Sequence, residues 1–153
     1  MDHSMQGHHY RRLLVMMVLS FLAMYVLMYA MVDRLPHVFN SINQVYMAGL
    51  MAAAMLIIEL LAMGSMYPQK KWNMILIIVG AVALIGFWLA IRQQAAVGDR
   101  QFLRSMIPHH SGAILMCQQA KLTDPEIRTL CESIITGQQS EIDQMKAMLE
   151  RKR

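Results

Sequence analysis

The sequence predicts an all-α membrane protein, with three transmembrane helices followed by an antiparallel helical hairpin. Three stretches of the 153-residue chain, 13–32, 45–66 and 72–91, are mainly apolar. Each holds the ~20 residues that a helix needs to cross a bilayer. The chain is 56% hydrophobic and only 16% charged, whereas charged residues make up about a quarter of an ordinary soluble domain. These observations exclude a water-soluble enzyme with a large core.

Positive charges near the apolar stretches predict the orientation in the membrane. Arg11 and Arg12 precede the first stretch, and Lys70 and Lys71 lie in the short turn between the second and the third. Short cytoplasmic loops are rich in Lys and Arg. We therefore expect a bacterial inner-membrane protein, with a cytoplasmic N-terminus, a retained first span and a periplasmic C-terminal segment. Three arginines in 92–104 argue against this orientation.

Residues 99–150 read as two helices joined by a short turn. Asp99 can cap the first helix, and apolar residues then recur at three- and four-residue steps. Thr123 and Glu126 fit a capping box for the second helix, and Pro125 fits its first turn. The predicted seam of the first helix comprises Phe102, Met106, His109, Ala113, Met116, Cys117 and Ala120. The predicted seam of the second comprises Ile127, Leu130, Cys131, Ile134, Gln138, Glu141, Ile142, Met145 and Leu149.

The antiparallel hairpin predicts which residues of its two helices meet. Positions equally distant from the turn at Asp124 lie at the same height. This pairs Cys117 with Cys131, His110 with Gln138, and Met106 with the turn from Glu141 to Met145. Sulfur, imidazole, amide and carboxylate groups are therefore expected close together.

Histidine and thioether groups together suit a soft metal ion. Methionine selects Cu(I), and imidazole accepts copper, zinc or nickel. Copper, as Cu(I), is the expected metal, with Ag(I) or zinc as alternatives. The other interpretation is that the histidines are ordinary polar surface residues and that the methionines fill a core.

A pair of motifs in the hairpin resembles a known family. Met-Ile-Pro-His-His stands at 106–110, and Gln-x-x-Glu-Ile-x-x-Met stands at 138–145. Together they resemble the signature of domain-of-unknown-function family 305, over about a third of the chain. That family is described as ferritin-like, and studied members resemble periplasmic copper-binding or copper-resistance proteins. The resemblance implies metal ligands at Met106, His109, His110, Met116 and Met145, with Asp99, Gln138 and Glu141 as outer candidates.

Cys117 and Cys131 depart from the family pattern, in which small residues are expected. Facing cysteines in an oxidising periplasm favour a disulfide, provided that their Cα atoms lie within about 7 Å. Two alternatives are open. The cysteines can be thiolate ligands for Cu(I) or zinc, or simply two small buried apolar residues.

Neither a catalytic centre nor a nucleic-acid surface is expected. No Glu is followed three residues later by a His, so the ligand pair of ferritin-type di-iron enzymes is missing. The basic residues are dispersed and lack interleaved aromatics.

The hairpin alone cannot bury the apolar seams of both its helices. This predicts a homodimer that completes a four-helix bundle, or a higher oligomer. A helical membrane partner would serve equally, and a copper-handling partner protein is a further candidate.

The second apolar stretch holds another candidate site. Glu59 is the one charge within the spans, and methionines accompany it at four-residue steps. An ionisable side chain inside a membrane suggests an ion path by default. A metal transport path would use Glu59, Met51, Met55 and Met63. The alternative is plain packing, with Glu59 hydrogen-bonded to a neighbour.

The N-terminal tail, 1–12, holds a third candidate site. It contains His3, His8 and His9, and a free amine followed by a histidine can bind Cu(II) in tetragonal geometry. A disordered tail without a metal role is the alternative.

Taken together, these features of the sequence predict a membrane-anchored protein that sequesters, buffers or delivers Cu(I) in copper homeostasis. The rival function is a structural or accessory membrane protein whose hairpin is an oligomerisation module.

Overall fold

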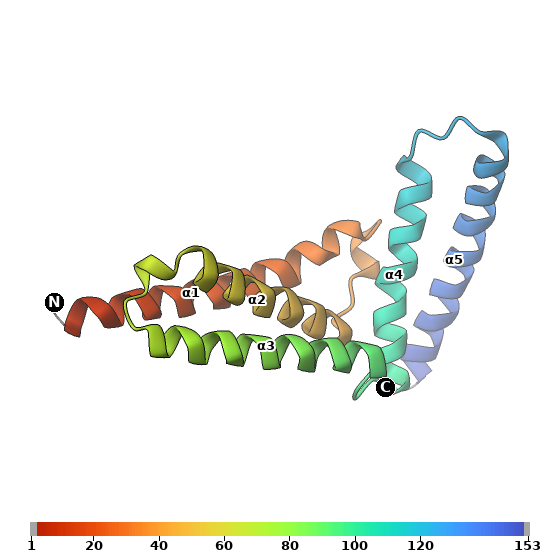
Figure 1. Cartoon of the computed structure of the whole chain (residues 1–153). Coiled ribbons are helices and arrows are strands. Elements are labelled where there is room, and N and C mark those ends of the chain that lie inside the picture. The colour runs from red at the N-terminus through yellow and green to blue at the C-terminus, as the bar shows by residue number, and fades with distance from the viewer. Residues whose placement is uncertain (1–2, 152–153) are drawn as a thin grey trace. The chain divides into compact units, whose positions relative to one another are not determined.

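The computed structural model describes residues 3–151 and is helical, with no strand among those residues. Five long helices follow one another: α1 (His3–Leu27), α2 (Ile42–Ala62), α3 (Lys70–Gln93), α4 (Asp99–Gln119) and α5 (Pro125–Arg151) (Figure 1). Three short 3-10 turns are η1 (Met28–Met31), η2 (Leu35–His37) and η3 (Gly64–Met66). The predicted all-α fold is confirmed.

The chain divides into two compact units. The first, here called the apolar unit, holds α1, α2 and α3. The second, here called the hairpin unit, holds α4 and α5 together with the segment Met28–Gln44. The sequence did not reveal that this segment belongs with the hairpin, because its composition is that of an ordinary loop between two spans.

Three helical segments are long and apolar enough to cross a membrane, as predicted. They are His8–Met31, Ile42–Ala62 and Lys70–Gln93. Most side chains of the first and third are not buried inside the protein, which is compatible with a membrane protein whose helices face lipid. In the structure α1 begins at His3, within the predicted tail at 1–12. Met1 and Asp2 lie outside the described residues.

Glycines let α2 and α3 approach closely inside the apolar unit. A methyl group added at Gly49 would lie 2.6 Å from the ring of Phe87, and one added at Gly80 would lie 3.0 Å from Ile57. Small residues at helix interfaces are typical of helices that pack within a membrane.

A buried apolar cluster joins α4 and α5 in the hairpin unit. It comprises Leu103, Ile107, Ile114, Ile142 and Met145. The predicted seam of α4 was wrong by about one residue, since Phe102 and Met116 are half exposed. The reason is that α4 packs on two sides, against α5 and against η1 and η2.

The helix caps also differ from the predictions. The N-cap of α4 is Gly98, and Asp99 lies in the first turn. At the start of α5 the capping side chain is Asp124 and not Thr123. Its Oδ1 accepts hydrogen bonds from the backbone N–H groups of Glu126 and Ile127, at 2.8 and 3.2 Å. An Asp at this position satisfies two of the N–H groups that the first turn leaves without partners.

Candidate metal site in the hairpin unit

His110 on α4 and Glu141 on α5 form the centre of the candidate site. Their Nε2 and Oε2 atoms lie 2.6 Å apart. An ionised carboxylate can only accept a hydrogen bond, so this contact places the proton of the imidazole on Nε2. In the neutral imidazole, the Nδ1 atom of His110 then carries the lone pair.

Two buried acceptors at this level have no hydrogen-bond partner. They are Nδ1 of His110 and Oε1 of Gln138, and Gln138 lies one helical turn before Glu141 on the face that meets α4. An unsatisfied buried polar atom costs about 1–3 kcal/mol. Both atoms offer a lone pair, so the arrangement suits a bound cation.

Two thioethers lie one helical turn from this pair. Met106 precedes His110 by four residues and packs against the core, and Met145 follows Glu141 by four residues and is buried. Residues four apart are neighbours on a helix surface. The structure thus brings His110, Glu141, Gln138, Met106 and Met145 to the facing sides of α4 and α5.

The other predicted ligands lie elsewhere. His109 and Asp99 are exposed, and Met116 is 55% exposed. Asp99 is also 11 residues before His110 on the same helix, a distance of about 16 Å. Among the described side chains, those of residues 8–151, no three or more His, Cys, Asp or Glu are grouped as a metal site. Any metal held here would therefore rely on thioether or amide ligands.

Cys117 and Cys131 are joined in a disulfide. Their Cα atoms lie 5.3 Å apart, and the bond closes the turn between α4 and α5 with a sequence separation of 14. While the bond is intact neither sulfur is a thiolate, so the two cysteines supply no ligand. A cross-link over a loop of this length is worth about 3 kcal/mol to the folded state in the chain-entropy model.

A buried polar cluster, here called the Asp33 clasp, fastens the Met28–Gln44 segment to α4. It consists of Asp33, Arg34, His37 and Ser111. The backbone N–H of Asp33 donates to Ser111 Oγ at 2.8 Å, and the Ser111 hydroxyl donates to Asp33 Oδ1. His37 Nδ1 lies 2.6 Å from the same carboxylate, and Arg34 Nε donates to its other oxygen at 2.8 Å. Because Ser111 follows His110 directly, the clasp fixes the rotation of α4 at the candidate site.

The clasp was missed in the sequence. Asp33 and His37 are four residues apart in a segment whose sequence resembles a loop. Ser111 lies 78 residues after Asp33. One signal was available at Gly112, where an added methyl group would lie 3.3 Å from the carbonyl oxygen of Met31. Two small residues, Ser111 and Gly112, directly follow the two histidines. Small side chains at this place indicate that another segment of the chain approaches the helix closely.

The carboxyl group of Asp33 is strongly acidic in this setting. Burial raises its pKa, but hydrogen bonds from Ser111, His37 and Arg34 outweigh that effect and lower the pKa from 3.8 to about 2. Asp33 is therefore ionised in the folded protein at any ordinary pH.

This pKa predicts that the hairpin unit loses stability in acid. A carboxyl group with a depressed pKa stabilises the fold above its unfolded pKa, and this contribution disappears as the pH falls through the folded pKa. For Asp33 this loss of stability takes place as the pH falls from 3.8 to about 2. The free energy of unfolding should decrease by roughly 2 kcal/mol over this range. Urea unfolding followed by circular dichroism over this range measures the loss. Asp33→Asn should flatten the dependence. The exposed Asp143, changed to Asn, is the control, and an equal flattening there would contradict the prediction.

The intramembrane candidates differ in their exposure. Glu59 lies in the last turn of α2, and its Oε1 accepts a hydrogen bond from the buried Tyr67 hydroxyl at 3.1 Å. Met63 lies beyond the end of α2 and is exposed, whereas Met51 and Met55 are half-buried. In the tail region His8 is exposed and His9 half-buried, and the His3 side chain lies outside the described part.

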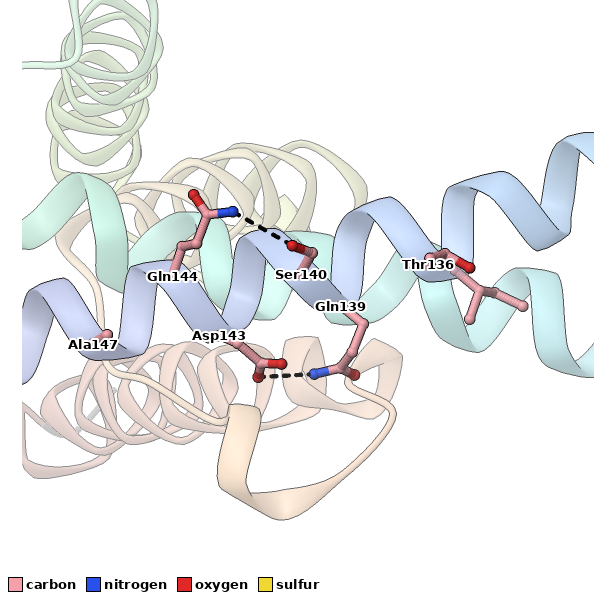
Figure 2. Close-up of a pocket in the computed structure, with 7 residues that line it drawn as sticks. Thr136, Gln139, Ser140, Asp143, Gln144 and Ala147 are labelled. Carbon is pink, nitrogen blue, oxygen red and sulfur yellow. Dashed lines mark hydrogen bonds between the residues drawn. The ribbon is translucent and has the colours of Figure 1, made fainter.

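A shallow pocket on the outer face of α5 is unrelated to this chemistry. Its volume is about 700 Å³, and all of its lining residues lie on α5. Figure 2 shows that its polar side chains bond to one another: Gln139 donates to Asp143 at 3.1 Å, and Gln144 donates to Ser140 at 3.4 Å. One helix face with mutually satisfied side chains does not enclose a ligand.

Comparison with known proteins places the hairpin in a family. The family described as Domain of unknown function (DUF305) matches residues 89–149. A protein of Acanthamoeba polyphaga mimivirus, named "Uncharacterized protein L153", is 33% identical over 144 residues, covering 92% of this chain and 93% of the relative. No solved structure matches the chain. Since the match to the family contains α4 and the His110–Glu141 pair, and the viral relative covers 92% of the chain, the chain belongs to the DUF305 family.

Proposed function

We propose that the hairpin unit binds Cu(I) at Nδ1 of His110 and thereby sequesters, buffers or delivers copper. The observation that carries the proposal is the state of this imidazole. Its side chain is 10% exposed, its Nε2 faces Glu141, and its buried Nδ1 has no partner. A histidine that binds a metal typically donates its other ring N–H to a carboxylate, which fixes the tautomer and raises the basicity of the ligand.

The neighbours of His110 favour copper over zinc. Thioethers select Cu(I), whereas zinc prefers thiolates, imidazoles and carboxylates. The groups nearest in helical register are the Met106 and Met145 thioethers and the Gln138 amide, and the cysteines are occupied by each other. Under this proposal Glu141 does not bind the metal itself. It accepts the hydrogen bond from His110 and acts through that imidazole.

The proposal includes membrane anchoring by α1, α2 and α3, in a bacterial inner membrane with the hairpin unit on the periplasmic side. The Cys117–Cys131 disulfide supports that side, because disulfides persist in oxidising compartments. A second copy of the chain is the proposed partner for the apolar side chains that the hairpin leaves exposed. These include Phe102, Met116, Ile127 and Leu130, and dimerisation would complete a four-helix bundle.

Competition for Cu(I) against a coloured chelator tests the proposal on the full chain in detergent. His110→Ala should weaken Cu(I) binding more than about 100-fold, because it removes a ligand and not only an outer partner. His109→Ala is the matched control, since it removes a neighbouring but exposed imidazole and should leave most of the affinity. Circular dichroism verifies that both variants are folded.

Two outcomes would contradict the proposed function. If the unchanged protein removes no copper from the chelator, the hairpin is better regarded as an oligomerisation module. If His109→Ala abolishes binding and His110→Ala does not, the buried imidazole is not the ligand.

A further inference from the structure

The apolar unit contains a cleft that the copper proposal does not use. Its volume is about 600 Å³, and residues of α1, α2 and α3 line it together with Gln69. The Tyr10 hydroxyl donates to Asn73 Oδ1 at 2.7 Å, which ties α1 to α3 beside the cleft. The lining residues are Tyr10, Leu13, Leu14, Met17, Leu56, Gln69, Trp72 and Leu76. Such a surface suits an aliphatic chain with a polar group at one end.

Two cations flank the polar end of this cleft. Lys70 and Lys71 stand between the lining residues Gln69 and Trp72 in the sequence, whereas Arg11 and Arg12 line a separate pocket on another face of α1. All four cations are exposed. Within the described residues, no ion pair of theirs is found among the salt bridges.

Among the residues that the structure describes, no acidic residue stands beside these cations in the sequence. The stretches 8–16 and 63–76 contain neither Asp nor Glu. The nearest carboxylate in the sequence, Glu59, accepts the hydrogen bond from Tyr67. The end of the apolar unit that holds the cleft therefore has an excess of positive charge.

The first turn of α3 adds backbone donors at the same place. The helix begins at Lys70, and its N-cap residue, Gln69, makes no side-chain capping bond. The first N–H groups of a helix have no partner within the helix, and the helix dipole favours an anion there. Trp72, which lines the cleft, is 54% exposed and suits the boundary between lipid and water.

We propose that this end of the apolar unit binds one anionic phospholipid. An acyl chain occupies the cleft, and the phosphate lies at the start of α3 beside Lys70 and Lys71. A zwitterionic lipid would fill the cleft but leave the excess charge uncompensated, whereas basic pockets between membrane helices bind anionic headgroups. The inference rests on the proposed membrane anchoring but not on copper binding.

Native mass spectrometry of the full chain in detergent tests this inference. Phosphatidylglycerol and phosphatidylcholine with identical acyl chains serve as the probes. We expect saturable retention of one phosphatidylglycerol per chain and weaker retention of phosphatidylcholine. Lys70→Gln/Lys71→Gln should weaken phosphatidylglycerol binding about 30-fold, since each basic residue near a lipid surface contributes about a fivefold preference. Leu14→Trp, which fills the cleft without changing charge, should also reduce retention.

Lys121→Gln/Arg151→Gln is the matched control, because it removes two exposed cations from the hairpin unit and should leave lipid retention unchanged. Equal retention of the two lipids, or retention unaffected by Lys70→Gln/Lys71→Gln, would mean ordinary contact with surrounding lipid and would overturn the proposal. So would full competition by glycerol phosphate, which lacks acyl chains. Cu(I) affinity measured on the same variants should not change, so failure here is distinguishable from failure of the copper proposal.

Discussion

Asp33→Ala is expected to destabilise the hairpin unit by about 3 kcal/mol. The substitution removes the acceptor shared by His37 and Ser111, whose side chains are 2% and 0% exposed. Each buried group left without a partner costs about 1–3 kcal/mol. Arg34 also loses its carboxylate partner. Because its side chain is 53% exposed, the lost ion pair adds little to the total loss of stability. Urea unfolding measures the total, and hydrogen exchange should show the largest loss of protection in Met28–Gln44 and the middle of α4.

Asp143→Ala is the matched control for this effect. Asp143 is an exposed carboxylate on α5 that accepts one hydrogen bond from Gln139 (Figure 2). Its removal should change stability by no more than about 0.5 kcal/mol. Equal losses in the two variants would contradict a structural role for the clasp.

The long helices and their pairing were predictable because they depend on local patterns. Apolar runs of the right length gave α1, α2 and α3. Antiparallel geometry about the turn at Asp124 predicted that Cys117 faces Cys131, and their Cα atoms do lie 5.3 Å apart. The same geometry brought His110 to the level of Gln138, one turn from its observed partner, Glu141.

The rotation of α4 was not predictable from its own sequence. Apolar residues stand next to each other at 102–103 and at 106–107. The helical repeat of apolar residues therefore fits equally well through 102 and 106 or through 103 and 107. The structure buries Leu103 and Ile107 and leaves Phe102 half exposed. The choice depends on the Met28–Gln44 segment, whose contact with α4 links residues far apart in the chain and leaves no periodic pattern.

This rotation decides which of the two adjacent histidines is the better candidate ligand. Successive residues on a helix point about 100° apart, so only one of the pair can face α5. The motif alone treats His109 and His110 as equivalent, and the resemblance to the family implied both. The structure buries His110 and exposes His109, a distinction that follows from the clasp at Ser111 and the core contacts of Ile107.

Glu141→Gln should weaken Cu(I) binding by about 10- to 100-fold. Glutamine retains an oxygen that can accept from His110 Nε2, but it removes the negative charge 2.6 Å from the ring. Loss of that charge should make the imidazole a poorer ligand, because a carboxylate partner on the other ring nitrogen strengthens metal binding by histidine. Competition against the coloured chelator measures the change. Glu132→Gln on the exposed side of the same helix is the matched control, and it should bind Cu(I) like the unchanged protein.

A double variant distinguishes action through His110 from direct ligation by Glu141. If the carboxylate acts only by tuning the imidazole, Glu141→Gln should have no further effect once His110 is replaced by alanine. The two free-energy changes would then be strongly non-additive, as expected for groups in one hydrogen-bonded unit. If Glu141 instead binds the metal itself, each substitution removes a separate ligand and the losses add. Additive losses would therefore reassign the carboxylate as a ligand and contradict the arrangement in which Nδ1 of His110 binds copper while Nε2 is held by Glu141.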